Sequence, residues 1–129
     1  MSLRVAAIQF TVVQGDVATN SAYACHAIEE AAQAGAQLIV LPEMWSTGFA
    51  YGKLPELAAA ETPRVVKELC ELSARHSLVI IGSQPIAVDD GRVANAVHVI
   101  DRGQVIAVYT KLHLFSLLGE DRYFQAGNA

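Results

Sequence analysis

The stretch LIVLPEMWSTGF, residues 38–49, changes its chemistry within a single step of the chain. The aliphatic run from Leu38 to Leu41 predicts a strand that is buried on both faces. Pro42 ends this strand, because proline has no N–H to donate to a sheet. Glu43 follows at once, so a carboxylate stands at the mouth of an apolar core. The rest of the chain decides whether Glu43 is a solvated loop residue or part of a reaction site.

Length, composition and charge describe one packed domain. The chain has 129 residues, 53% hydrophobic and 17% charged, and two domains would each be near the lower size limit. Its net charge is −4 with no basic run, so we expect no nucleic-acid partner. No apolar run approaches the roughly 20 residues of a membrane helix, and no signal-peptide pattern occurs, so no membrane partner is expected. Two cysteines make no disulfide framework, which favours a reducing, cytoplasmic location.

Aliphatic runs and turn signals predict the sheet. Strands are expected over residues 3–10, 38–41 and 78–84, and the helical patterns between them are typical of a βαβαβ unit with parallel strands. The turn signals VDDGRV and DRGQV then separate short runs at 93–100 and 105–109, which predicts an antiparallel meander. We therefore expect an α/β protein whose mixed sheet has helices on one face. The strands are apolar on both sides, so the second face also needs a cover.

Two helices are expected between these strands. Asn20 is the predicted N-cap of a helix over residues 21–34, and Gly35 is its predicted stop. Thr62 and Pro63 predict an N-cap followed by proline at the first helical position of a helix that ends near His76. The predicted apolar faces contain Ala22, Cys25, Ile28 and Ala32 in the first helix and Val65, Val66, Leu69 and Leu72 in the second.

Two later residues can join Glu43 at the ends of strands. Lys111 directly follows the run VIAVYT, and Glu120 lies nine residues further along. Strand ends border the usual binding crevice of open α/β sheets. Two carboxylates around one ammonium stabilise each other and titrate as a coupled set, with the lysine held charged. The alternative is plain solvation, with Lys111 at an exposed strand end and Glu120 in the charged turn GEDR.

Histidines and cysteines are expected to be structural. His113 could be a ligand or a base, but a packed histidine that hydrogen-bonds the backbone is favoured. No metal-binding spacing relates the other histidines, His26, His76 and His98, so no metal or other cofactor is expected. Cys25 and Cys70 lie within helical patterns and are expected to be small core hydrophobes.

Four segments, AAIQF, LIVLPEMWSTGF, GSQPI and YTKLHLFSLLGEDRYFQAGN, together resemble the carbon–nitrogen hydrolase (nitrilase) superfamily. The resemblance runs in order over essentially the whole chain. It implies an α-β-β-α sandwich with a Cys-Glu-Lys triad and often a second glutamate. By motif, Glu43 would be the general base, Lys111 the stabiliser of the tetrahedral intermediate, and Glu120 the second glutamate, which helps to position substrate. The spacing from Lys111 to Glu120 resembles the branch that cleaves ω-amides of 2-oxo acids.

The implied reaction converts a small amide to a carboxylate and ammonia through a cysteine thioester. A thiol is only a few per cent thiolate at neutral pH, so a nearby carboxylate base raises its reactive fraction. A fixed cation at the developing oxyanion contributes roughly 3–4 kcal/mol in comparable sites. These needs match the residue types at Glu43 and Lys111.

One part of the family pattern is missing from the sequence. The nucleophile of the family lies on a sharp turn after a strand beyond the lysine motif, and the sequence ends at Ala129 before such a segment. Since family members are about twice this length, we expect residues 1–129 to be the N-terminal half of the sandwich, truncated before the nucleophile segment. Homo-oligomerisation or pairing with a C-terminal half would then cover the open sheet face. The alternative function is a catalytically inactive half-domain that binds a partner or a ligand.

Overall fold

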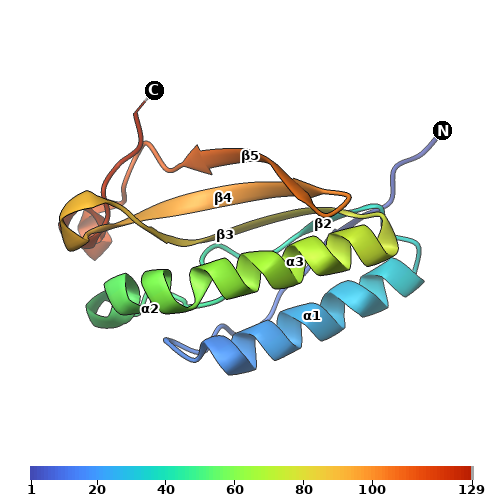
Figure 1. Ribbon diagram of the computed structural model, residues 1–129, viewed down its shortest axis with the longest axis horizontal. Coiled ribbons are helices and arrows are strands. Elements are labelled where there is room, and N and C mark those ends of the chain that lie inside the picture. The colour runs from blue at the N-terminus through green and yellow to red at the C-terminus, as the bar shows by residue number, and fades with distance from the viewer. Residues whose placement is uncertain (129) are drawn as a thin grey trace.

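The computed structural model describes residues 1–128, which form a five-stranded sheet with a layer of helices on one of its faces (Figure 1). The spatial order of the strands is β1-β2-β3-β4-β5, the same as their order along the chain. β1, β2 and β3 are parallel, whereas β4 and β5 add antiparallel pairs. The expected mixed sheet is thus confirmed. The strands are β1 Val5–Ala7, β2 Leu38–Val40, β3 Val79–Ala87, β4 Val93–Asp101 and β5 Gln104–Thr110.

The helices α1, α2 and α3 all lie on the same side of the sheet (Figure 1). The helices are α1 Val17–Gln33, α2 Leu54–Ala60, α3 Thr62–His76 and α4 Glu120–Tyr123, and short 3-10 turns occur at Tyr51–Lys53, Asp89–Gly91 and Ser116–Leu118. Ile28 of α1 and Leu69 of α3 pack in one core with Ile39, Ile80 and Ile100 of the sheet, all fully buried. None of the helices within residues 1–128 is long and apolar enough to cross a membrane.

Two of the three parallel strands, β1 and β3, differ in length from the prediction. Only three residues of the expected strand 3–10 pair in β1, because its partner β2 is itself only three residues long. β3 continues past residue 84 to Ala87 because the nine-residue strand β4 runs alongside it. Val40 is 37% exposed, so the expectation of burial on both faces is wrong for β2. Within the described residues the helices cover only the other face.

The first helix begins one turn earlier than predicted. Asp16 is its N-cap, and the Asp16 carboxylate accepts a hydrogen bond from the Thr19 backbone N–H at 3.0 Å. Asn20 lies inside the helix, where its side-chain amide donates to the backbone oxygens of Val13 and Ser46. The predicted N-cap is therefore wrong, because Asn20 uses its polar atoms to hold two neighbouring loops. Ala22, which was expected on the apolar face, is exposed, whereas Ala24 and Ile28 are buried.

The second helical region contains one helix more than predicted. α2 is short and begins with a proline near its N-terminus, so its pattern is weak in the sequence. α3 begins with Thr62, while Glu61 occupies the N-cap position. The Thr62 hydroxyl donates to the backbone oxygen of Pro85 at 2.6 Å instead of capping the helix. The predicted end at His76 is confirmed, and Val66 is only half-buried.

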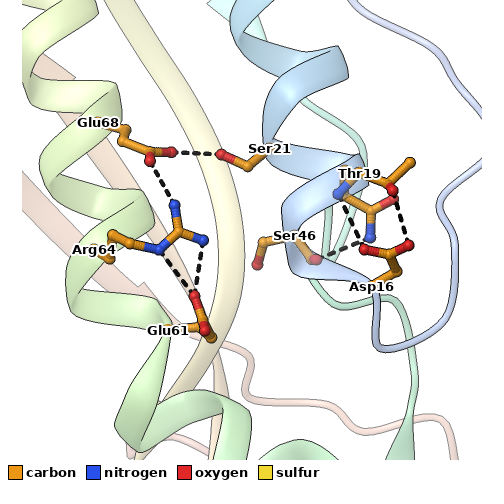
Figure 2. A network of polar contacts seen from close by, with 8 residues as sticks. Asp16, Thr19, Ser21, Ser46, Glu61, Arg64 and Glu68 are labelled. Atoms are coloured by element: carbon orange, nitrogen blue, oxygen red, sulfur yellow. Dashed lines mark hydrogen bonds and ion pairs between the residues drawn. The ribbon is translucent and has the colours of Figure 1, made fainter.

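A chain of polar contacts joins α1 to α3 (Figure 2). The Ser21 hydroxyl donates to the Glu68 carboxylate, and Arg64 donates to Glu68 and also to Glu61. A separate ion pair between Arg75 and Glu29, at 3.1 Å, joins the same two helices. These contacts hold α1 and α3 together in the layer that covers one face of the sheet (Figure 1).

Candidate functional site

Glu43 begins a tight turn, residues 43–48, here named the Glu43 turn. Met44 has φ 53°, in the left-handed region that non-glycine residues rarely occupy. Its backbone N–H donates to the Ser83 hydroxyl of β3 at 2.9 Å, and its carbonyl accepts from the Gly48 N–H at 2.8 Å. Residues 44–48 are buried, but half of the Glu43 side chain is exposed. Residues 44–48 therefore hold the turn inside the protein, and the Glu43 carboxylate is left at the surface.

Lys111 joins the two predicted carboxylates. It follows β5 directly, and its Nζ lies 2.9 Å from Glu43 Oε1 and 3.1 Å from Glu120 Oε1. The backbone N–H of Lys111 donates to the carbonyl of Asn95 at 2.9 Å, which continues the pairing of β4 and β5 past the strand end. The expected proximity of Glu43, Lys111 and Glu120 is confirmed as a matter of geometry.

Glu120 is held as firmly as the lysine. It is the first residue of α4 and only 4% exposed. The Phe115 backbone N–H donates to Glu120 Oε2 at 2.7 Å, while the ammonium of Lys111 binds the same carboxylate. A buried carboxylate needs such partners to remain charged. The alternative of a solvated Glu120 in a charged turn is therefore wrong.

Asn95 of β4 is a site residue that the sequence reasoning missed. Its side-chain amide donates to Glu43 Oε1 at 2.8 Å, and the residue is 3% exposed. Glu43 Oε1 thus accepts from both Asn95 and Lys111, whereas Oε2 receives no hydrogen bond from residues 1–128. The available signal was a buried asparagine within the aliphatic strand VANAV, since polar residues in such strands are rarely buried without a partner.

The electrostatics of the site keep the lysine charged. Burial by itself lowers the pKa of Lys111, but the hydrogen bonds that Lys111 donates to Glu43 and Glu120, and the negative charges of these two residues, raise it more, so the net pKa is raised. Lys111 is accordingly an ammonium at neutral pH and can stabilise a negative charge beside it.

A cavity of about 290 Å³ opens next to these residues. Its walls are mainly apolar, with Val40, Ile81 and Val97 among them, and Glu43 and Lys111 line its polar side. An apolar pocket with a few convergent polar groups is typical of a small-molecule site, and this volume is at the small end of that class. The exposed face of the sheet therefore carries both the charged residues and the space for a ligand.

The remaining candidates lie apart from this cluster. His113 is exposed, so the expectation of a packed histidine is wrong there. Cys25 of α1 and Cys70 of α3 are half-buried in the helical layer, next to the core as predicted. Burial raises the pKa of each thiol, and the charge of Glu68 adds to this at Cys25. A smaller fraction of each thiol is therefore thiolate at neutral pH than in a free cysteine. Residues 1–128 contain no group of three or more His, Cys, Asp or Glu side chains arranged to hold a metal ion.

Comparison with known proteins identifies the family. Residues 4–129 match the family model described as carbon–nitrogen hydrolase. The chain belongs to the carbon–nitrogen hydrolase family. Among curated members, it is 30% identical to 2-oxoglutaramate amidase of Bacillus subtilis over 99% of this chain and 49% of that protein. It is 31% identical to an omega-amidase of Homo sapiens over 90% of this chain and 42% of that protein.

Structures of this family also share the fold. An amidase from Nesterenkonia sp. superposes with a TM-score of 0.88 at 22% identity, over 98% of this chain and 49% of that chain. The carbon–nitrogen hydrolase family and the fold class predicted from the sequence are confirmed. The chain spans about half the length of the curated relatives it matches, and it corresponds to their N-terminal half.

Proposed function

We propose that this carbon–nitrogen hydrolase is an amidase that cleaves a small amide to a carboxylate and ammonia. In this proposal Glu43 is the general base, Lys111 stabilises the oxyanion, and Glu120 is the second glutamate. The observation that carries the proposal is the position of Lys111 Nζ, 2.9 Å from Glu43 and 3.1 Å from Glu120 at the edge of a cavity.

The geometry suits each step of such a reaction. Glu43 Oε2 is the carboxylate oxygen without a hydrogen bond from residues 1–128, so it can take the proton of a thiol while Oε1 stays bound to Lys111 and Asn95. The thiolate would attack the amide carbon, and Lys111 would face the resulting oxyanion. The proton then passes to the leaving nitrogen, which departs as ammonia and leaves a thioester. Water, deprotonated by Glu43, hydrolyses the thioester and releases the acid.

The thiol in this proposal comes from outside residues 1–128. Cys25 and Cys70 lie in the helices that cover the opposite face of the sheet from Glu43 and Lys111. Their raised pKa values also disfavour the thiolate. Residues 1–129 alone are therefore proposed to be inactive, as the N-terminal half of an α-β-β-α sandwich.

The substrate class is proposed from the relatives and the cavity. Both curated relatives named above are amidases, one of 2-oxoglutaramate and one of omega-amides. We propose an ω-amide of a short 2-oxo acid, which matches a cavity of about 290 Å³ with one ammonium at its edge. A cytoplasmic location would suit both this substrate and a free catalytic thiol.

The test begins with the gene and continues with an assay of ammonia release. Reading downstream of codon 129 should show a strand followed by a cysteine, and the protein with that extension should release ammonia from a 2-oxo-ω-amide. Glu43→Gln should lower kcat by roughly 10² to 10⁴ because it removes the base. Glu56→Gln, on the exposed surface of α2, is the matched control and should leave kcat unchanged.

Two results would contradict the proposal. The first is thiol-dependent turnover by residues 1–129 alone that Cys25→Ala or Cys70→Ala abolishes. The second is full activity in Glu43→Gln. A folded protein that binds the amide without turnover, with or without the extension, would instead support the alternative of an inactive binding half-domain.

A further inference from the structure

Three consecutive residues of β3 support the Glu43 turn, each in a different way. Gly82 leaves room for an indole, since a Cβ at this position would lie 3.1 Å from Trp45 Nε1. The Ser83 hydroxyl accepts the backbone N–H of Met44 at 2.9 Å. Gln84 Oε1 accepts the indole N–H of Trp45 at 2.9 Å. The segment GSQ of β3 thus holds Met44 and Trp45, the two residues that follow Glu43.

The side-chain amide of Gln84 is also held by His98 of β4, through its Nε2. Indole nitrogen only donates, so Gln84 must present Oε1 to Trp45 and Nε2 to His98 Nδ1, with which it is in hydrogen-bond contact. His98 Nδ1 must therefore accept, which places the ring proton on Nε2. Burial lowers the pKa of His98, although a backbone contact with Ala96 opposes the shift, and a neutral ring agrees with this arrangement. Gln84 and Trp45 are both fully buried, so each depends on the other for its polar partner.

The buried contacts of Trp45, Gln84 and His98 support a backbone position of the site that is unfavourable for a residue other than glycine. Met44 stands between Glu43 and Trp45 and has a left-handed φ of 53°. Such a residue keeps its conformation only when its surroundings hold it there. Ser83 holds the N–H of Met44, and Gln84 holds the ring of Trp45. These two contacts therefore also fix the direction in which the Glu43 side chain points.

We propose that Gln84, oriented by His98, is a positioning residue for Glu43. It holds Trp45 and, together with Ser83, keeps the Glu43 turn in the conformation that brings the carboxylate to Lys111. The value of this for catalysis rests on the proposed role of Glu43 as base. The contact between Glu43 and Lys111 can, however, be measured without any catalysis.

The protein offers two direct NMR readouts. Trp45 is its one tryptophan, so a single indole N–H signal reports the bond to Gln84. The pKa of Lys111 reports the position of Glu43, because the hydrogen bond that Lys111 donates to this carboxylate helps to raise the pKa. In Gln84→Met, which keeps length but has no amide, the indole signal should move upfield and the pKa of Lys111 should fall.

Three further variants test whether Gln84 positions Glu43 or only fills the core. Gln84→Glu keeps an acceptor for Trp45 and can bind His98 through the opposite ring tautomer, so it should restore both readouts. Ile80→Val, at a fully buried position of the same strand, should lower stability while leaving both readouts at their parental values. Trp45→Phe tests the link from its other end and should lower the pKa of Lys111 as Gln84→Met does.

The proposal is overturned if the pKa of Lys111 is unchanged in Gln84→Met and in Trp45→Phe. It is also overturned if Ile80→Val lowers that pKa as much as Gln84→Met, since Gln84 would then only fill the core. Neither result depends on ammonia release. A protein that lacks amidase activity but shows the expected shifts would reject the proposed function and keep this inference.

Discussion

Lys111 shares one ammonium between two carboxylates in different surroundings. The Glu43 side chain is half exposed, whereas the Glu120 side chain is 5% exposed. Water can solvate Glu43 if the lysine is lost, but it cannot reach Glu120 as easily. The buried glutamate therefore depends more on the lysine for stability, and the exposed one is freer for chemistry.

Replacing Lys111 by methionine should lower the free energy of unfolding by about 2 kcal/mol at pH 7. Removal of one partner leaves a buried charge uncompensated, and we take a value below the full penalty because Lys111 is itself 28% exposed. Urea unfolding measures the loss. Lys67→Met, whose side chain is 78% exposed on α3, is the control and should change stability by less than about 0.5 kcal/mol. Equal losses in the two variants would contradict the importance of Glu120 burial.

Stability should also depend on Lys111 at alkaline pH. Its pKa is raised in the folded protein above the ordinary value of 10.5. The lysine thus contributes stability that is fully present below pH 10.5 and is lost as the pH rises through the folded pKa. Urea unfolding of the parent and of Lys111→Met at successive alkaline pH values should show that their difference shrinks above this point. A difference that is constant through that range would show that Lys111 is not linked to folding.

The β4–β5 hairpin shows how one turn joins the sheet to the helical layer. Arg102 and Gly103 both have positive φ, 45° and 86°, as two-residue hairpin turns require. The Gly103 N–H donates to the Ser73 hydroxyl of α3 at 3.1 Å, and a Cβ on Gly103 would lie 2.9 Å from the Cβ of Ala74. The turn therefore packs directly against the helix.

Gly103→Ala should lower the free energy of unfolding by about 2–3 kcal/mol. About 1–2 kcal/mol would come from a side chain in the left-handed region, and the rest from the contact with Ala74. Gly91→Ala is a matched control, because its φ of 69° is similar but nothing lies within 4 Å of the added Cβ. Gly91→Ala should lose only the about 1–2 kcal/mol that comes from the left-handed conformation, as measured by urea unfolding. A loss at Gly91 as large as that at Gly103 would mean that the hairpin does not press on α3.

Local sequence signals predicted the elements best where packing and capping agree. The bounds of β4 and β5 were correct to within one residue, and the end of α3 at His76 was correct, because the same residues pair or pack there. β3 was found, but it continues three residues past its predicted end. The start of α1 was wrong because Asp16 and Asn20 are both good caps, and only tertiary contacts with Ser46 decide between them. Glu43 and Lys111 could be predicted from the strands that they follow, because β2 and β5 both end at the same end of the sheet.

Local signals could not predict the partners of the supporting residues. Asn95 and Gln84 act through partners 52 and 39 residues away in the chain, so a polar residue in an aliphatic run indicates that a partner is needed but not which residue it is. Motif resemblance marked the segment GSQPI but not the bond from Gln84 to Trp45. Such contacts follow from register, which depends on how β3 and β4 pair along their whole length.

β5 is one of the two edge strands of the sheet, and it carries an exposed apolar surface. Its large side chains alternate between the two faces of the sheet and are 40–61% exposed. These side chains are Val105, Ile106, Val108 and Tyr109. Open strand edges and contiguous apolar patches favour association with another chain. A net charge of −4 gives only weak repulsion against it.

Residues 1–129 alone should therefore self-associate. Size-exclusion chromatography should show species larger than the monomer, and Val108→Lys should shift them towards the monomer by placing a charge on the β5 edge strand. Val13→Lys, at an exposed apolar position before α1, is the control and should not change the elution. A sharp monomer peak with a cooperative melt and no binding of an apolar dye would show that these residues form a complete small domain.

Strand order in this sheet also has a consequence for synthesis. Each strand joins the edge left by the one before it, so the sheet can grow as the chain leaves the ribosome without reopening any earlier pair. Lys111 follows Glu43 by 68 residues, a gap of roughly 3–14 s at typical elongation rates. β3 emerges within that interval and can already support the turn through Ser83 and Gln84. A nascent chain stalled before codon 111 is expected to hold the turn in place while its carboxylate still lacks a cation.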